Sequence, residues 1–314
     1  MHWRRNIRLS CWRRCQVNSQ DSGVRGHGTG RQRTVADSLA AASLQLTTAL
    51  GLDKREARLE ARVLAAHAWN AAPIWLIAHD TDPLTGDQTT RFQALLQKRL
   101  SGEPIAYITG QREFYGREFH VTPDVLIPRP ETELLVELAL ARIPPDQAVE
   151  VLELGTGSGC IAISLALERP HARIIAVDRS EAALAIARLN AEALGAQVEF
   201  LASDWFAALG QRKFDLIVGN TPYVAAADPH LGRGDVRFEP RHALASGEAG
   251  LDDILRIARQ SRAHLLPGGS LLLEHGYNQV NAVSRILKEA GFGGILTWPD
   301  LSKTDRVSGG QVSE

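Results

Sequence analysis

Two different hydrophobic periods divide the chain. From Thr34 to about Gly102, apolar residues recur at steps of three and four, which predicts amphipathic helices. Three helices are expected, on the apolar sets Val35, Leu39, Ala42, Leu46 and Leu50; Leu59, Val63, Leu64 and Ala66; and Phe92, Leu95, Leu96 and Leu100. A break at Pro83–Gly86 precedes the third. The pattern predicts a small helical domain over residues 34–103, which serves either as a structural lid or in substrate recognition.

The hydrophobic period changes in the next segment. Residues 104–123 alternate as a β-hairpin does, with strands expected at Ile105–Thr109 and Glu118–Val121. Residues 104–130 are therefore expected to be a hairpin linker between two domains. Pro130 then suits the start of a helix, since proline fits the first helical turn.

From residue 131 to residue 314 the rhythm is strand, loop, helix. Apolar strands are expected at 149–154, 173–177, 198–202, 214–218 and 270–274, with helices near 159–168, 180–194, 251–265 and 278–290. This alternation predicts a doubly wound, mostly parallel α/β sheet of the Rossmann-like kind, with helices on both faces. Ligands of such sheets lie beyond the carboxyl ends of the strands. Residues that directly follow strands are therefore expected to share one crevice.

The first 33 residues have a different composition. They hold eight Arg and one acidic residue and no sustained apolar period, which predicts a disordered basic head. The head lacks the apolar centre of a secretory signal, and its Arg-rich composition leaves a mitochondrial transit peptide as the minor alternative to a cytoplasmic protein. Three cysteines fit a reducing compartment. No apolar stretch approaches the roughly 18 residues that cross a membrane, so no membrane partner is expected.

The remaining chain is acidic. Residues 34–314 carry 27 basic and 35 acidic residues, whereas a protein that follows a phosphate backbone usually shows the opposite balance. This balance argues against direct nucleic-acid binding. The histidines show no metal-ligand spacing, so no metal is expected.

A glycine loop connects the first predicted strand of the sheet to its helix. Glu153–Gly159 reads E-L-G-T-G-S-G, which differs from the G-x-G-x-x-G of dinucleotide folds and is of the kind that holds S-adenosylmethionine. A strand-to-helix turn without a ligand is the alternative. The candidate cofactor-binding residues of the loop are Gly155, Thr156, Gly157, Ser158 and Gly159.

Two later strand ends add candidate cofactor contacts. Asp178 ends the next strand, where a carboxylate can accept hydrogen bonds from both ribose hydroxyls. Asp204 follows the third strand and can bond an adenine amine, while Trp205 can pack on the adenine ring. The alternatives are a surface Asp and a buried aromatic residue after a strand.

The most specific motif is the turn Asn220-Thr221-Pro222-Tyr223 after the fourth strand. The Asn220 side-chain oxygen and a backbone carbonyl of the turn can accept the two N–H bonds of a planar –NH2 group. The Tyr223 ring can cover its face, and Pro222 restricts the turn. All four residues are candidates for substrate binding, Asn220 and Tyr223 also for catalysis, and Asn220 for cofactor contact. With the glycine loop, the turn predicts methyl transfer to an amide or exocyclic amine nitrogen.

At these residues the chain resembles the class I S-adenosylmethionine-dependent methyltransferases that act on amino nitrogens. The finer resemblance is to the release factor glutamine methyltransferase family, PrmC/HemK, and includes Gly102–Tyr107, Arg112–Tyr115, Leu126–Glu133, Ser203–Phe206, Gly234–Pro240 and Leu271–Gly276. It implies a helical domain that recognises peptide-chain release factors and methylation of the glutamine in their Gly-Gly-Gln loop. The alternatives are a ribosomal-protein glutamine methyltransferase, a nucleic-acid adenine or guanine amino methyltransferase, and a non-catalytic adaptor.

The chain departs from that family in three places, one of which is the head, because residues 1–33 have no recognised counterpart in the family. Thr221 stands where the family usually has a first proline, so the turn is expected to be less rigid. Ser308–Glu314 does not resemble the family's closing strand and is expected to be a tail. This tail contains Gly309-Gly310-Gln311, which is either a coincidence or a pseudo-substrate.

Overall fold

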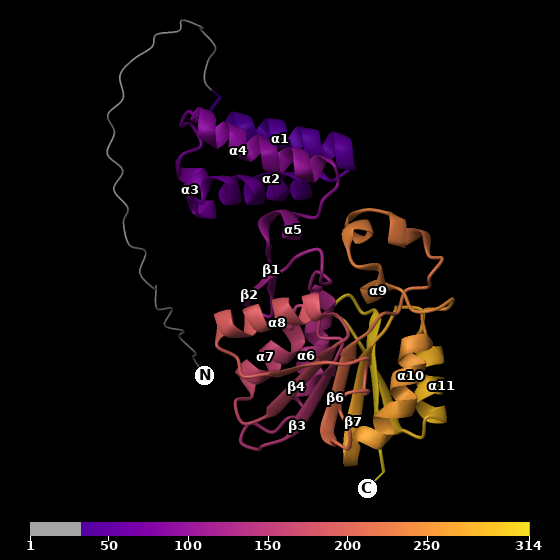
Figure 1. Ribbon diagram of the computed structural model, residues 1–314. Helices are drawn as coiled ribbons and strands as arrows, with labels where there is room; N and C mark the ends of the chain where they lie inside the picture. The colour runs from indigo at the N-terminus through magenta and orange to yellow at the C-terminus, as the bar shows by residue number, and fades with distance from the viewer. Residues whose placement is uncertain (1–32, 314) are drawn as a thin grey trace, which may run out of the picture.

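The computed structural model describes residues 33–313, so residues 1–32 of the predicted basic head lie outside it. Figure 1 shows a helical bundle that stands above a larger α/β domain, with a narrow connection between them. The bundle consists of α1 (Val35–Leu50), α2 (Lys54–Trp69), α3 (Pro73–Ala78) and α4 (Gly86–Leu100). The three helices that the apolar pattern predicts are confirmed, and α3 is an additional short helix. The exact limits of the predicted domains stay predictions.

Local signals fix where the bundle helices begin. Thr34 caps α1 and Thr85 caps α4, each by a reciprocal hydrogen bond with the third residue of its helix, and the Asp53 carboxylate caps α2. The prediction that Leu59 belongs to the buried face of α2 is wrong, since Leu59 is 62% exposed. The buried face of α2 instead carries mostly alanines, which let α1 and α4 approach closely: Ala57, Ala61, Leu64, Ala65 and Ala68.

The connection contains a helix where a strand was expected. Ile105–Thr109 forms α5, and the hairpin consists of β1 (Gln111–Phe114) and β2 (Arg117–His120). The prediction of a strand at Ile105–Thr109 is therefore wrong. Pro104 precedes the helix and Gly110 ends it in the left-handed conformation, and these two residues limit α5 to a single turn.

A seven-stranded sheet forms the α/β domain. Its strands are β3 (Glu150–Leu154), β4 (Arg173–Asp178), β5 (Glu199–Ala202), β6 (Phe214–Asn220), β7 (Leu265–Glu274), β8 (Gly293–Pro299) and β9 (Asp305–Gln311). They lie in the order β5-β4-β3-β6-β7-β9-β8, with the first five parallel and β9 antiparallel to both neighbours. The predicted doubly wound, mostly parallel fold is confirmed.

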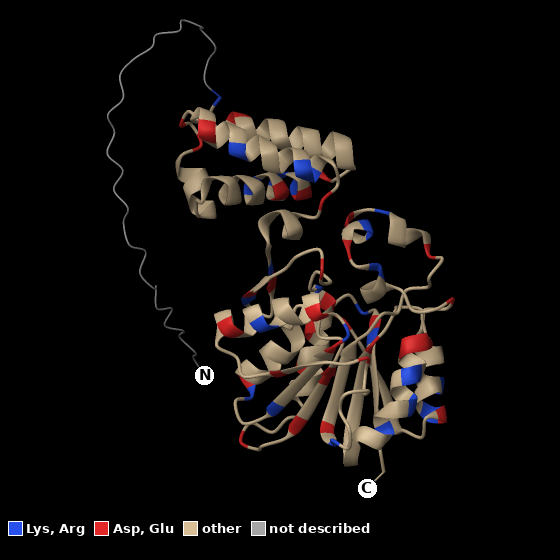
Figure 2. Ribbon diagram, in the orientation of Figure 1, with Lys and Arg blue, Asp and Glu red and all other residues tan. Residues whose placement is uncertain are grey.

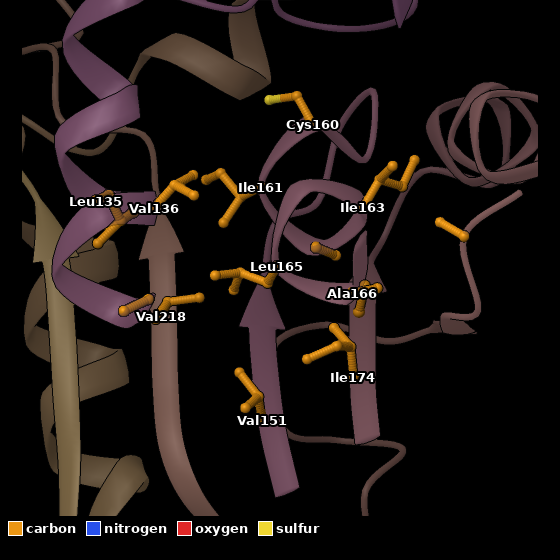
Figure 3. Close-up of a cluster of buried hydrophobic side chains, with 14 of the residues drawn as sticks. Leu135, Val136, Val151, Cys160, Ile161, Ile163, Leu165, Ala166, Ile174 and Val218 are labelled. Atoms are coloured by element: carbon orange, nitrogen blue, oxygen red, sulfur yellow. The ribbon is translucent and has the colours of Figure 1, made fainter. Parts of the chain in front are cut away.

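Alternate residues of each strand enter two separate cores. On one face, α6 (Glu133–Leu140) and α7 (Cys160–Glu168) pack on the sheet, where Val136 and Leu165 belong to the same buried cluster as Val151 and Val218 (Figure 3). A 3-10 turn at Pro130–Thr132 leads into α6, as the proline signal predicts. On the other face lie α10 (Asp252–Ser261), η4 (Arg262–His264) and α11 (Val280–Glu289). The helix α8 (Glu181–Leu194) packs beside α7.

The segment between β6 and α10 reaches from the sheet towards the bundle (Figure 1). It contains η2 (Pro229–Gly232), η3 (Asp235–Phe238) and α9 (Arg241–Leu244). The Arg237 guanidinium donates a hydrogen bond to the Ser101 carbonyl at 2.9 Å. Figure 2 shows acidic and basic residues interspersed along the ribbon of both the bundle and the α/β domain.

The expected C-terminal tail is instead an internal strand. Ser308, Gly309 and Gly310 lie in β9 between β7 and β8, and all three are buried. A Cβ atom on Gly309 would lie only 2.5 Å from the Leu271 carbonyl oxygen, so the close approach of β7 requires glycine there. The pseudo-substrate interpretation of Gly309-Gly310-Gln311 is wrong, because these residues hold the sheet together.

Candidate active site

A pocket lies beyond the carboxyl ends of the parallel strands, where the fold predicts it. The sequence-predicted residues that line it are Gly155, Thr156, Gly157, Ser158, Asp178, Asp204, Trp205, Asn220 and Pro222. Gly159, Thr221 and Tyr223 do not line it. The lining also contains residues that the sequence did not predict. They include the segment before α6, with Asp124, Val125, Leu126, Pro128, Arg129 and Thr132, and the α9 residues His242 and Ala243.

The glycine loop is held in place from two sides. The N–H groups of Gly155 and Thr156 both donate to the Val177 carbonyl, at 2.9 and 3.0 Å. Gly159 has φ +82°, and a Cβ atom there would lie 2.8 Å from the Ile163 side chain and 3.1 Å from Ala187. Gly159 therefore does not face the pocket but lets the loop pack against the neighbouring helices.

Asp178 connects the loop to the next strand. Its Oδ2 accepts a hydrogen bond from the Gly157 N–H and its Oδ1 accepts one from the Ser180 N–H, each at 2.9 Å. A carboxylate offers about four acceptor positions, so it keeps capacity for two hydroxyl donors in the pocket. This geometry fits the ribose contact expected from the sequence, and that contact stays a prediction.

Glu153 lies buried in the pocket wall beneath the loop. Its Oε2 accepts hydrogen bonds from the Thr156 hydroxyl at 2.6 Å and the Ala162 N–H at 3.1 Å, while Oε1 has no partner among the described residues. Burial raises the pKa of Glu153 to about 8, although both hydrogen bonds act in the opposite direction. An unpaired buried acceptor in the wall is a group that a bound ligand can satisfy.

Trp205 forms another part of the wall. Its backbone has φ +52°, and its ring would lie 3.4 Å from a Cβ atom on Gly155. The indole N–H donates to Asp253 at 3.2 Å, which fixes the ring. Asp204 lines the pocket, yet both its oxygens accept from the Arg256 guanidinium, at 3.0 and 2.8 Å. The adenine contacts of these two residues stay predictions.

The turn after β6 presents one free acceptor to the pocket. The Asn220 Nδ2 donates to the Thr132 hydroxyl at 3.0 Å, and no donor of the described residues bonds its Oδ1. The Thr221 side chain is buried and its hydroxyl has no partner among these residues. The Tyr223 hydroxyl points away from the pocket wall and donates to Glu274 Oε1 at 3.3 Å. Thr132, which lines the pocket, and Glu274, which does not, thus each form a hydrogen bond with a residue of the turn.

Neither supporting residue was predicted. The available signal was their position in the segments Leu126–Glu133 and Leu271–Gly276, which contribute to the family resemblance. Over residues 33–313, no group of three or more His, Cys, Asp or Glu side chains is placed to hold a metal. Within the same range, no helix is long and apolar enough to cross a membrane.

The fold and this pocket define an enzyme of the class I methyltransferase type. The family model described as Methyltransferase small domain matches residues 131–233, and the one described as PrmC N-terminal domain matches residues 37–110. The chain belongs to the release factor glutamine methyltransferase family, as two curated relatives show. The Bordetella pertussis enzyme of that name is 50% identical over 256 residues, which cover 81% of this chain and 95% of the relative. The Escherichia coli enzyme is 46% identical over 255 residues, covering 81% and 92%.

A solved structure carries a similar title. The protein-(glutamine-N5) methyltransferase (release factor-specific) from Alicyclobacillus acidocaldarius is 31% identical. The match covers 62% of this chain and 100% of that chain, with a TM-score of 0.39.

Proposed function

We propose that the protein transfers a methyl group from S-adenosylmethionine to the side-chain amide nitrogen of the glutamine in the Gly-Gly-Gln motif of peptide-chain release factors. The observation that carries this proposal is the free Asn220 Oδ1 at the pocket wall. The backbone carbonyl of the next residue, Thr221, is the second acceptor that the proposal requires. Two fixed acceptors match the two N–H bonds of a primary amide. Membership of the family supports the choice of substrate.

The pocket residues suit this cofactor. The glycine loop and Asp178 would hold its amino-acid and ribose parts, with Glu153 Oε1 as a further acceptor, and Trp205 and Asp204 would contact the adenine. When bound, S-adenosylmethionine supplies a methyl carbon that its sulfonium makes electrophilic. The apolar wall residues around Asn220, such as Pro222 and Ile161, limit water access to the reacting atoms.

The turn can compensate for the low nucleophilicity of the substrate's amide nitrogen. The lone pair of an amide nitrogen is delocalised into its carbonyl, so orientation contributes more than a strong base. Bonds from the substrate N–H groups to Asn220 Oδ1 and to the Thr221 carbonyl would aim the lone pair, and Tyr223 would cover the amide plane. Positioning of this kind contributes roughly 7–11 kcal/mol at best. The methylated nitrogen, which has lost its resonance, then releases its proton readily to water.

The protein substrate is large compared with the pocket, so a second recognition surface is required. The helical bundle stands above the α/β domain (Figure 1) and would supply such a surface for the release factor. Only three cysteines occur in the chain, which supports a reducing compartment, the cytoplasm, where release factors act.

The test is a methyl-transfer assay with labelled cofactor that offers release factor, ribosomal protein and DNA side by side. We expect label in the release factor alone, and none in a release factor whose Gly-Gly-Gln glutamine is replaced by alanine. Label in ribosomal protein or in DNA would assign the enzyme to one of the alternative substrate classes. No transfer to any substrate would favour a non-catalytic adaptor.

A further inference from the structure

A buried side-chain amide contacts the last residue of the substrate-binding turn, Asn220–Tyr223, from outside the pocket. It belongs to Gln279, which follows β7 and directly precedes α11. Gln279 is 8% exposed and does not line the pocket. No step of the proposed reaction uses this amide. Burying it is costly unless its hydrogen bonds are made, so its partners indicate what it does.

Both polar atoms of this amide bond the main chain. Gln279 Nε2 donates to the carbonyl of Tyr223 at 2.9 Å, and the carbonyls of Ala249 and Gly250 each lie 3.2 Å from it. Gln279 Oε1 accepts from the Gly276 N–H at 2.8 Å. An –NH2 group has two protons. The shortest bond therefore takes one proton, and the two longer bonds share the other.

These partners allow one orientation of the amide. With its oxygen and nitrogen exchanged, the oxygen would face three carbonyls and the –NH2 group would face the Gly276 N–H, so none of these hydrogen bonds could form. The loop before α10 also approaches the turn too closely for a side chain at position 250. A Cβ atom on Gly250, whose φ is +71°, would overlap the Tyr223 carbonyl oxygen. The turn and this loop are thus packed together around the Gln279 amide.

The bonded carbonyl limits where the Tyr223 ring can lie. The ring is attached to the Cα atom beside that carbonyl, so fixing the carbonyl restricts the backbone from which the ring projects. The far end of the ring is held by its hydroxyl, which donates to Glu274 at 3.3 Å. On the next residue, the Val224 N–H donates to the Leu244 carbonyl at 2.8 Å. Gln279 thus connects the backbone of the turn to the end of β7.

We propose that Gln279 is a positioning residue for methyl transfer. It fixes the Tyr223 backbone through the carbonyl, and so places the ring where it covers the substrate amide. This proposal rests on the proposed function, because the place of the ring matters only for a substrate that the turn holds. The place of the ring can nevertheless be measured without any substrate.

The kinetic test uses two substitutions at one position. Gln279→Glu keeps an acceptor for the Gly276 N–H but turns an oxygen towards the three carbonyls. Gln279→Met removes the donor and the acceptor and adds no charge. A donor that touches the transition state is worth on the order of 10²–10³-fold in kcat, and Gln279 acts through the backbone, so we expect kcat for release factor to fall about tenfold or more in both variants. Cofactor affinity, measured by calorimetry, should change far less than kcat.

Gln88→Glu is the matched control for the charge and the shape. The Gln88 side-chain oxygen also accepts from the backbone N–H three residues earlier, that of Thr85, at 3.0 Å. Glutamate can accept this bond equally well, so kcat should be unchanged. A variant of Gln279 that is folded by circular dichroism and has kcat within twofold of wild type would overturn the proposal. If Gln279→Glu does not fold, Gln279→Met decides by the same limit.

A spectroscopic measurement separates this proposal from the proposed function. The chain has four tyrosines, so protein labelled with 3-fluorotyrosine gives one ¹⁹F resonance for each, and Tyr223→Phe assigns that of Tyr223. Without substrate, this resonance should shift or broaden in both variants of Gln279, while those of Tyr107 and Tyr115 stay in place. An unchanged Tyr223 resonance would overturn the proposal even if release factor is methylated. The expected change, without methylation of release factor by the wild type, would overturn only the proposed function.

Discussion

The guanidinium of Arg99 donates a hydrogen bond to the carboxylate of Asp235 at 2.8 Å, and so connects the helical bundle to the segment that follows the substrate-binding turn. The same guanidinium donates two bonds to Glu60 within the bundle, at 2.8 and 3.0 Å. The Arg99 side chain is 5% exposed, whereas that of Asp235 is 43% exposed. The bundle is thus connected to the catalytic domain through one nearly buried cation.

Arg99 and Asp235 should contribute unequally to stability. Arg99→Met keeps the apolar stem but leaves Glu60 buried without its cation, which should lower the free energy of unfolding by about 3–5 kcal/mol. Asp235→Asn should cost about 1 kcal/mol or less, because the carboxylate is partly exposed. Denaturant unfolding measures both, with Asp87→Asn of the exposed Asp87–Arg91 pair as the control. Equal losses for Arg99→Met and Asp235→Asn would contradict this account.

Asn220→Ala should abolish most catalysis and leave cofactor binding intact. It removes the side-chain acceptor of the turn, and deletion of one preorganised hydrogen bond costs on the order of 2–4 kcal/mol of activation free energy. Measurement of kcat with release factor tests the loss of catalysis, and calorimetry tests whether cofactor affinity is unchanged. Activity above half of wild type would remove Asn220 from its catalytic role.

Asp178→Ala should weaken cofactor affinity far more than it slows the bound complex. The expected loss is that of charge-assisted hydrogen bonds to the ribose, each worth roughly 1.5–3 kcal/mol. Asp215→Ala is the matched control, because Asp215 also accepts from a backbone N–H, that of Glu150, but at the other end of the sheet. Calorimetry with unchanged affinity for Asp178→Ala would show that this carboxylate lies outside the cofactor site.

Thr221→Pro should hold or raise kcat. The Thr221 hydroxyl has no partner among the described residues, so proline removes no side-chain hydrogen bond of this part of the chain. Asn220 lies at the end of a strand, in the extended conformation that proline requires before it. A compatible proline adds about 0.4–1 kcal/mol of stability. A large fall in kcat would mean that the Thr221 hydroxyl contributes to the reaction.

The stability of the protein should fall as pH rises from about 4.5 to about 8. Burial raises the pKa of Glu153 from 4.5 to about 8, so between these values the folded state binds more protons than the unfolded state. The free energy of unfolding then decreases with pH, by at most about 1.4 kcal/mol per pH unit for one proton. Denaturant unfolding from pH 6 to pH 9 should show a shallower decline in Glu153→Gln than in wild type. Parallel declines would mean that Glu153 is ionised throughout.

Hydrophobic periodicity was sufficient to predict the strands that are buried on both faces of the sheet. The five parallel strands are buried on both faces, and their apolar runs mark them clearly. The prediction of a strand at Ile105–Thr109 failed because five residues are too few to distinguish an alternating pattern from one helical turn. The strands β8 and β9 were missed, since Gly293 and Gly294, Gly309 and Gly310 give them no apolar pattern.

The position of a site residue could be predicted where that residue ends a strand, as Asn220 and Asp178 do. It could not be predicted where the residue acts by supporting another side chain. Thr132 and Glu274 act through hydrogen bonds to side chains 88 and 51 residues away in the chain, and no local spacing reports such a contact. The Asp204–Arg256 pair was missed for the same reason.

The sheet order also determines when the fold can be completed. The strand β8 pairs with β9 and with no other described strand, and β9 alone joins it to β7. During synthesis β8 leaves the ribosome before β9, so it has nothing to pair with until the later strand has emerged. The two must therefore add to the sheet together, as a hairpin. The newly made chain exposes the edge of β7 to other chains until then.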